Sequence, residues 1–197
     1  MKTKIVVSLL IMLVHIVGYA QKSNAGIYST AKDFQSNHIS ILADSTQRGG
    51  AIKIEDFLLR PFVWIKTSNG KQKISKDSVF AVRMPDKKIY RIVNNLNYLL
   101  ADSTNLYIYS LEKEVQVPVK TSRDTRLEKK RITEYYFSKT KTSKLQALTV
   151  QNVRLALTQD KAFEDELNAH FPTDQALYKH NKQGQFDINL YLTSLKK

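Results

Sequence analysis

The chain has 197 residues, a formal net charge of +13 and no cysteine. The lack of cysteine excludes disulfide frameworks, thiolate metal sites and thiol nucleophiles. A hydrophobic fraction of 42% with only 6 Gly and 4 Pro excludes a disordered or fibrous chain and is typical of a globular protein.

The N-terminal segment, residues 1–20, has the order of a secretory signal peptide. Lys2 and Lys4 precede an apolar run over residues 5–17, and the segment ends at the small residue Ala20. The run is shorter than the roughly 20 residues of a membrane-spanning helix, so we expect no transmembrane segment after cleavage. An exported chain without disulfides fits a bacterial envelope better than a eukaryotic secreted domain. Residues 21–197 are therefore expected to form a single globular domain in the periplasm, on the outer-membrane surface or outside the cell.

Short β-branched and aromatic runs fill the chain up to about residue 140 and predict strands. The Asn69-Gly70 step suits a tight hairpin because both residues tolerate positive φ, and Pro85-Asp86 marks a second turn. Consecutive hairpins of this kind predict an antiparallel meander. The predicted strands are residues 51–54, 62–66, 71–74, 79–84, 88–93, 98–101, 106–111 and 132–138.

The segment after residue 111 is less regular. Val115, Val117 and Val119 alternate, but Pro118 cannot donate to a ladder and limits them to an edge strand. Residues 120–127 show no period, so we expect a loop there.

The pattern becomes helical from about residue 145. Two predicted helices begin at the capping residues Thr149 and Asp160, Pro172 ends the second, and Thr173 begins a short third. The tail, residues 186–195, is ambiguous between a strand and a helical turn, and we favour a strand. The expected fold is α+β, an antiparallel β-meander of about six or seven strands packed by two or three C-terminal helices. The apolar stripes of the first two helices are Val150, Val153 and Leu157, and Phe163, Leu167 and Phe171.

Two hexapeptides of the chain nearly match. Residues 41–46 read ILADST and residues 99–104 read LLADST, and each ends an apolar run with a turn-forming Asp-Ser step. Reuse of one turn in two hairpins and duplication of a strand-turn unit both account for the match. We favour reuse, because the flanking residues do not extend it.

Much of the positive charge lies between residues 120 and 144, with nine basic residues against three acidic ones. Such a surplus attracts polyanions. Export removes cytoplasmic nucleic acid from reach and leaves an anionic polysaccharide, a glycolipid or released nucleic acid as the polyanion. A solvated segment whose charge only keeps the protein soluble is the simpler explanation, and we favour it. The expected phosphate or carboxylate contacts are Arg123, Arg126, Lys129, Lys130 and Arg131.

Aromatic residues make up 10% of the chain, and five of them fall on predicted strands. An exposed aromatic row beside lysines or arginines could stack on sugar rings and hold anionic groups. The alternative, which we favour, is that Trp64 is a core residue and the tyrosines are half-buried strand residues, as aromatic strand preference predicts. The five are Trp64, Tyr107, Tyr109, Tyr135 and Tyr136.

Signals for catalysis are few, and the sequence predicts no catalytic residue, no metal site and no cofactor. Glu166 and His170 lie four residues apart on a predicted helix, but zinc needs three or four converging ligands. No nucleophile elbow, Walker loop or dinucleotide-type glycine motif is present. A carboxylate pair, such as Glu164 with Glu166 or Asp33 with Asp56, is the one remaining hydrolase arrangement.

Several short segments resemble a family of small secreted, uncharacterised proteins of Bacteroidota. They are Ala20-Gln21, Gly26-Ile27-Tyr28, Asp33-Phe34, Lys76-Asp77-Ser78-Val79-Phe80, Tyr135-Tyr136-Phe137-Ser138 and Leu145-Gln146-Ala147-Leu148-Thr149. The resemblance implies a Gram-negative envelope location and lends no activity or cofactor. It also draws notice to Ser45, Ser103 and Ser78, whose surroundings are similar to the O-glycosylation pattern of that phylum.

Together these features predict an exported, non-enzymatic envelope protein that binds an anionic glycan or glycolipid surface through its basic segment. The alternative is a structural or partner-protein-binding module of the envelope, in which an aromatic face or an open sheet edge takes up another protein. A hydrolase that uses a carboxylate pair is third. The oligomeric state stays open.

Overall fold

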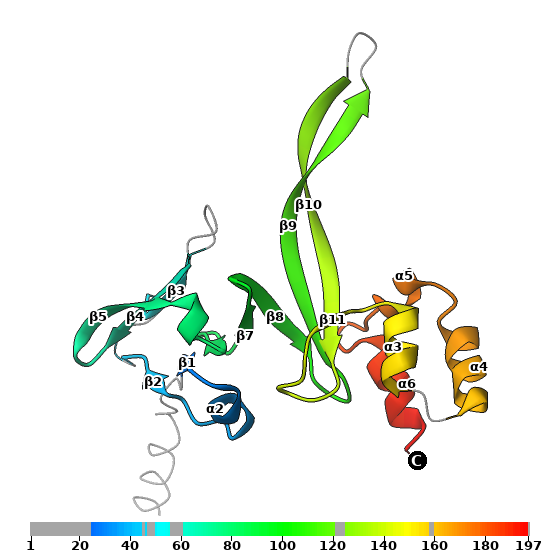
Figure 1. The fold of residues 1–197 in the computed structure, drawn as a ribbon, viewed down its shortest axis with the longest axis horizontal. Coiled ribbons are helices and arrows are strands. Elements are labelled where there is room, and N and C mark those ends of the chain that lie inside the picture. The colour runs from blue at the N-terminus through cyan, green and yellow to red at the C-terminus, as the bar shows by residue number, and fades with distance from the viewer. Residues whose placement is uncertain are drawn as a thin grey trace, which may run out of the picture.

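The computed structural model describes residues 25–44, 46, 50–55, 61–120, 125–157 and 160–196. Ser45, Asp56, Arg123 and the expected signal peptide lie outside these residues. Most described strands belong to one eight-stranded antiparallel sheet in the order β11-β10-β9-β8-β7-β6-β1-β2 (Figure 1). Its strands are β1 (Gly26–Tyr28), β2 (Ile41–Leu42), β6 (Ala81–Arg83), β7 (Ile89–Val93), β8 (Leu96–Asp102), β9 (Tyr107–Lys120), β10 (Thr125–Ser138) and β11 (Gln146–Ala147).

A second, three-stranded antiparallel sheet has the order β3-β4-β5. The helices of the described chain are α2 near the N-terminus and α3 to α6 at the C-terminus, with one 3-10 turn, η3. No described helix is long and apolar enough to cross a membrane. The bounds are β3 (Ile52–Ile54), β4 (Phe62–Thr67), β5 (Gly70–Ser75), α2 (Ala31–Gln35), η3 (Lys76–Ser78), α3 (Val150–Leu157), α4 (Lys161–His170), α5 (Asp174–Leu177) and α6 (Asp187–Ser194).

The α+β class with an antiparallel meander and C-terminal helices is confirmed, but the structure has more strands than expected. The additional strands β1, β2 and β11 have two or three residues each. Segments this short show no readable alternation, so their pairing depends on the sheet they join. The position of Gly26 on β1 also requires glycine, because a Cβ there would lie 2.5 Å from the carbonyl oxygen of Ile41 on β2.

The turns follow the sequence with one correction. Between β4 and β5 the positive φ of 107° belongs to Gly70, whereas Asn69 keeps negative φ. Asn94 and Asn95, with φ of 49° and 64°, form the two-residue turn between β7 and β8. This is the backbone of a type I′ hairpin, which asparagine tolerates.

The two ends of the large sheet have separate cores. At one end the inner face of the small sheet packs on β1, β6 and β7 through Ile52, Val63, Ile65, Val82 and Ile92. At the other end the C-terminal helices cover one face of β9 and β10. Their buried cluster contains Leu106, Ile108, Phe137, Leu148, Val153, Leu167, Phe171, Leu177, Phe186 and Ile188.

The capping residues predicted for the helices are largely correct. Asp160 accepts a hydrogen bond from Phe163 N at 2.8 Å, and Thr149 accepts one from Asn152 N at 3.1 Å. Thr173 precedes α5 without a side-chain cap. The strand expected over residues 186–195 is wrong, because this tail forms α6. The buried Asn189 exchanges two hydrogen bonds with the backbone of Leu106, and these contacts come only from the folded chain.

Strands β9 and β10 pair over 14 residues each and extend beyond all their neighbours (Figure 1). Strand β8 pairs with β9 no further than Ser110, and β11 meets β10 at Tyr136 and Phe137. We call the remainder the arm: residues 112–120 of β9 and 125–133 of β10. The loop expected over residues 120–127 is therefore wrong at Lys120 and at Thr125 to Leu127, which are strand; residues 121–124 lie outside the described chain.

Candidate functional site

The predicted basic contacts lie on the arm, but the arm divides them between two faces. Side chains alternate along β10, so Arg126 and Lys130 lie on one face and Lys129 and Arg131 on the other. Arg123 lies outside the described residues. The arm thus does not gather these cations into one contact surface.

Acidic residues of the arm also reduce its charge. Arg126 pairs with Glu128 at 2.5 Å, while Lys129 and Arg131 both lie 3.7 Å from Glu114 on the neighbouring strand. Residues 120–144 do not contain Glu114, so their linear charge count misses it. Such exposed ion pairs add little stability, but they weaken attraction for a polyanion.

Four of the five aromatic candidates lie at the base of the arm, and two of these four pack against neighbouring residues of the sheet. Tyr109 is fully buried, and Tyr136 packs edge-on against Tyr98 with ring centroids 5.0 Å apart. Tyr135 points to the opposite face, where its ring meets Tyr178 and Phe186 of the helical core. Tyr107, on the face of Tyr109, is half-buried. The five aromatics therefore do not form one exposed row.

Trp64 lies apart from the other four, at the centre of the small sheet. In the strand register it stands between Lys53 of β3 and Lys73 of β5. Its chain neighbours Val63 and Ile65 are fully buried in the core, so Trp64 faces outward. The prediction that Trp64 is a core residue is therefore wrong. The outer face of β3-β4-β5 thus presents an aromatic ring flanked by lysines.

Two lysine ammonium groups lie over aromatic rings of this face. Lys71 Nζ is 4.2 Å from the centre of the Trp64 ring, and Lys73 Nζ is 3.7 Å from that of Phe62. Lys66 shares the face, opposite Lys71 in the register. We call this surface the Trp64 platform: Phe62, Trp64, Lys53, Lys66, Lys71 and Lys73.

A surface hollow of about 320 Å³ opens beside Trp64. Glu55 lies at its rim and pairs with Lys53 at 3.0 Å. Four lysines against one carboxylate leave the platform net positive, without an acid on β4 or β5. The sequence held a signal for this site, because Phe62, Trp64 and Lys66 alternate on one strand, and Lys71 and Lys73 alternate across an Asn-Gly turn. The prediction instead placed the binding site at residues 120–144, because the density of positive charge along the sequence is high there.

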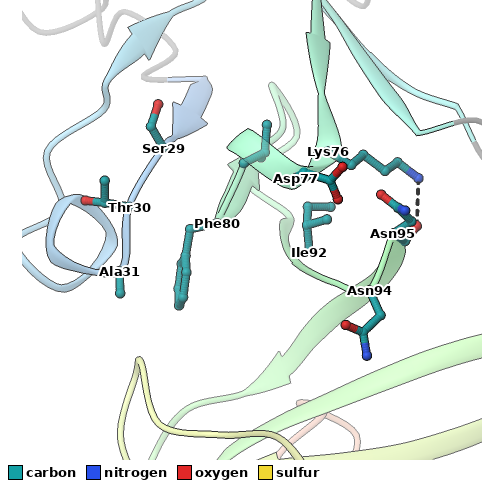
Figure 2. Close-up of a pocket in the computed structure, with 10 residues that line it drawn as sticks. Ser29, Thr30, Ala31, Lys76, Asp77, Phe80, Ile92, Asn94 and Asn95 are labelled. Atoms are coloured by element: carbon teal, nitrogen blue, oxygen red, sulfur yellow. Dashed lines mark hydrogen bonds between the residues drawn. The ribbon is translucent and has the colours of Figure 1, made fainter.

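A larger hollow of about 510 Å³ lies between the start of α2, η3 and the β7–β8 turn (Figure 2). Lys76 lines it and is 2% exposed, but its ammonium donates to the carbonyls of Glu55 and Asn95 at 2.9 and 3.1 Å. Its lining residues include no histidine, and Asp77 is their one carboxylate. Lys76 thus links the end of β3 to the β7–β8 turn, and the residues that line the hollow lack the paired acids of a hydrolase.

The remaining catalytic candidates have structural partners. Glu164 pairs with Arg154 at 2.9 Å, and Asp33 completes the capping box of α2 with Thr30. Glu166 accepts a hydrogen bond from the hydroxyl of Tyr191, on which the ring of His170 packs at 4.7 Å. Among the described residues no group of three or more His, Asp or Glu side chains could hold a metal ion.

The two matching hexapeptides form the same turn. The carboxylate of Asp44 accepts from the N–H and hydroxyl of Thr46, and that of Asp102 accepts from the same groups of Thr104. The shared hydrogen bonds fit both reuse of one turn and duplication of a strand-turn unit. Ser103 is exposed in the second turn, and Ser78 is exposed in η3 instead of a strand.

No protein-family model matches the chain, and comparisons with curated proteins and with solved structures give no match.

Proposed function

We propose that this protein is an exported, non-enzymatic envelope protein that binds an anionic glycan through the Trp64 platform. The carrying observation is the ammonium of Lys71 lying 4.2 Å above the Trp64 ring. The proposed ligand class is the one predicted from the sequence, but the proposed ligand contacts lie on the small sheet instead of the arm.

The chemistry of the platform fits a charged sugar. The C–H face of a sugar ring stacks on an indole ring, and lysine ammonium groups hold its carboxylates or phosphates. Exposed cation–π contacts are worth about 0.5–1 kcal/mol, so a ligand can displace Lys71 from the ring at small cost. The displaced ammonium then stays within reach of the anionic group.

Rigidity supports the same assignment. The platform lies on strands whose inner side chains, Val63 and Ile65, are fully buried. A ligand therefore meets a surface already in place, which lowers the ordering entropy of binding.

Trp64 makes the test direct, because it is the one tryptophan of the chain. Selective tryptophan excitation is followed during titration with oligogalacturonate, with a neutral oligosaccharide of the same length, and with vesicles containing anionic phospholipid. We expect the emission to change with oligogalacturonate and the apparent affinity to fall steeply with salt. A response to vesicles alone would identify a lipid headgroup as the source of the anion. Single-stranded DNA is titrated as a further polyanion, and a response equal to that with oligogalacturonate would contradict a glycan site.

Two double variants locate the site. Lys71→Gln with Lys73→Gln removes two charges from the platform, and Lys129→Gln with Lys130→Gln removes two from the arm. We expect the platform variant to weaken binding about tenfold or more and the arm variant to change it less than about threefold. A larger loss for the arm variant would mean that the ligand contacts lie on the arm. Equal losses would mean that binding depends only on the net charge of the protein.

A further inference from the structure

The outer edges of the arm differ in their capacity to accept another strand. The carbonyl of Tyr135 accepts a hydrogen bond from Leu148 N at 2.9 Å, so the backbone groups of Tyr135 point away from β9. Strands β9 and β10 pair in one unbroken register, and outward-pointing residues therefore recur at every second position. Ser110, opposite Tyr135, is outward by the same rule.

On β9 this alternation places Pro118 in an outward position, eight residues after Ser110. Proline has no N–H, and its place on an edge strand is the side that faces solvent. It interrupts the row of outward donors on β9 and opposes pairing with another chain.

On β10 the outward residues of the arm are Leu127, Lys129, Arg131 and Thr133, and each keeps its N–H. Strand β11 pairs with this same edge at Tyr136 and Phe137, and Leu148 adds its bond to Tyr135 before the chain turns into the helical region. The edge of β10 is thus already used as a pairing edge at its base. Further along the arm no described strand continues β11.

Charge indicates what this edge would accept. Lys129, Lys130 and Arg131 follow one another in the middle of the edge, so cations lie on both of its faces. A second copy of β10 in antiparallel pairing about this run would bring cations against cations, which is destabilising. An acidic strand would instead meet Lys130 on one face. On the other face it would meet Lys129 and Arg131, which share the single carboxylate of Glu114 at 3.7 Å and therefore keep a net positive charge.

We propose that residues 125–133 of β10 receive an extended acidic segment of a partner protein, which adds a strand to the large sheet. Backbone hydrogen bonds to Leu127, Lys129, Arg131 and Thr133 supply affinity, and the three cations supply selectivity. This interaction is independent of the Trp64 platform.

The test uses a synthetic Glu-Val peptide in which three consecutive glutamates are flanked by valines, so that its carboxylates lie on both faces of the added strand. A Gln-Val peptide of the same pattern is its uncharged counterpart. Amide hydrogen exchange, read residue by residue by NMR, is measured on the full mature chain. We expect the Glu-Val peptide to slow exchange at Leu127, Lys129, Arg131 and Thr133 about tenfold or more, while the outward amides of β9 stay unchanged. Equal protection on β9, equal protection by the Gln-Val peptide, or none with either peptide would overturn the proposal.

Matched proline variants separate the edge from the fold. Thr133→Pro removes an outward N–H from β10, and Gln116→Pro removes one from β9; neither change alters charge or the bonds between the two strands. We expect Thr133→Pro to weaken peptide binding about fivefold or more and Gln116→Pro to leave it unchanged. Protection that grows with protein concentration in the absence of peptide would identify pairing between copies and contradict an acidic partner.

Discussion

The carboxylate of Asp102 accepts a hydrogen bond from the backbone N–H of Phe186, 84 residues later in the chain, at 2.8 Å. One oxygen of Asp102 holds its own turn through Thr104, and the other fixes the start of α6. The turn between β8 and β9 is therefore also the attachment point of the C-terminal helix.

Asp102→Asn should destabilise the protein by about 1–3 kcal/mol, because an amide has one acceptor oxygen where the carboxylate uses two. Asp44→Asn is the matched control, since Asp44 forms the same turn with Thr46. Its cost should stay within about 0.5 kcal/mol. Urea unfolding of the two variants measures the difference, and equal costs would show that Asp102 does not anchor α6.

The contribution of Asp102 should depend on pH. Burial raises the pKa of this carboxyl, but hydrogen bonds from Asn189, Phe186 and Thr104 together hold the pKa below its ordinary value of 3.8. The folded chain thus binds this proton less readily than the unfolded chain, so the stabilisation is present above pH 3.8 and is lost as the pH falls through the folded pKa.

The difference in unfolding free energy between wild type and Asp102→Asn isolates this effect. Asp33, Asp44 and Asp86 also have lowered pKa values, but they titrate in both proteins. We expect the difference to be constant near neutrality and to shrink in acid. A difference that grows in acid would mean that the folded pKa is raised.

Substitutions on the two faces of β4 should destabilise the protein to different extents. Ile65→Ala should cost about 2–5 kcal/mol, because Ile65 is fully buried in the core beneath the small sheet. Trp64→Phe should cost under about 1 kcal/mol, chiefly its contact with Lys71. Thermal unfolding compares them, and a larger loss for Trp64→Phe would place the tryptophan in the core and remove the platform.

The O-glycosylation suggested by resemblance is tested by intact mass of the protein secreted by its native host. Among the described candidates, Ser103 and Ser78 are both exposed and sterically accessible. We expect a mass increase that disappears with Ser45→Ala or Ser103→Ala. An unmodified mass removes the hypothesis.

Much of the sheet could be read from local pattern. The strands around Trp64 and Tyr107 alternate as strands do, and the Asp160 cap begins α4 as predicted. The prediction of a strand for residues 186–195 was wrong for a physical reason. Asn189 and Phe186 form hydrogen bonds with Leu106 and Asp102 only in the folded chain. Periodicity carries no information about a partner 83 or 84 residues away.

The candidate sites show the same limit. A count along the chain places nine cations near one another at residues 120–144, but strand alternation sends consecutive ones to opposite faces, and Glu114 joins from the neighbouring strand. Conversely, Lys53 and Trp64 are eleven positions apart in sequence and become neighbours through β3–β4 pairing. Residue type alone made Trp64 a candidate binding residue, and only the strand register showed which lysines lie beside it.

The sequence by itself determined the α+β class, most hairpins, the caps of α3 and α4 and the overall positive charge. These properties depend on neighbours within a few residues, whose spacing is visible in the chain. Only the tertiary structure decided which face each cation occupies, that residues 186–195 form a helix, and that β10 keeps an open edge while Pro118 interrupts that of β9. Those outcomes depend on strand register and on contacts between distant residues, which close only when the chain folds.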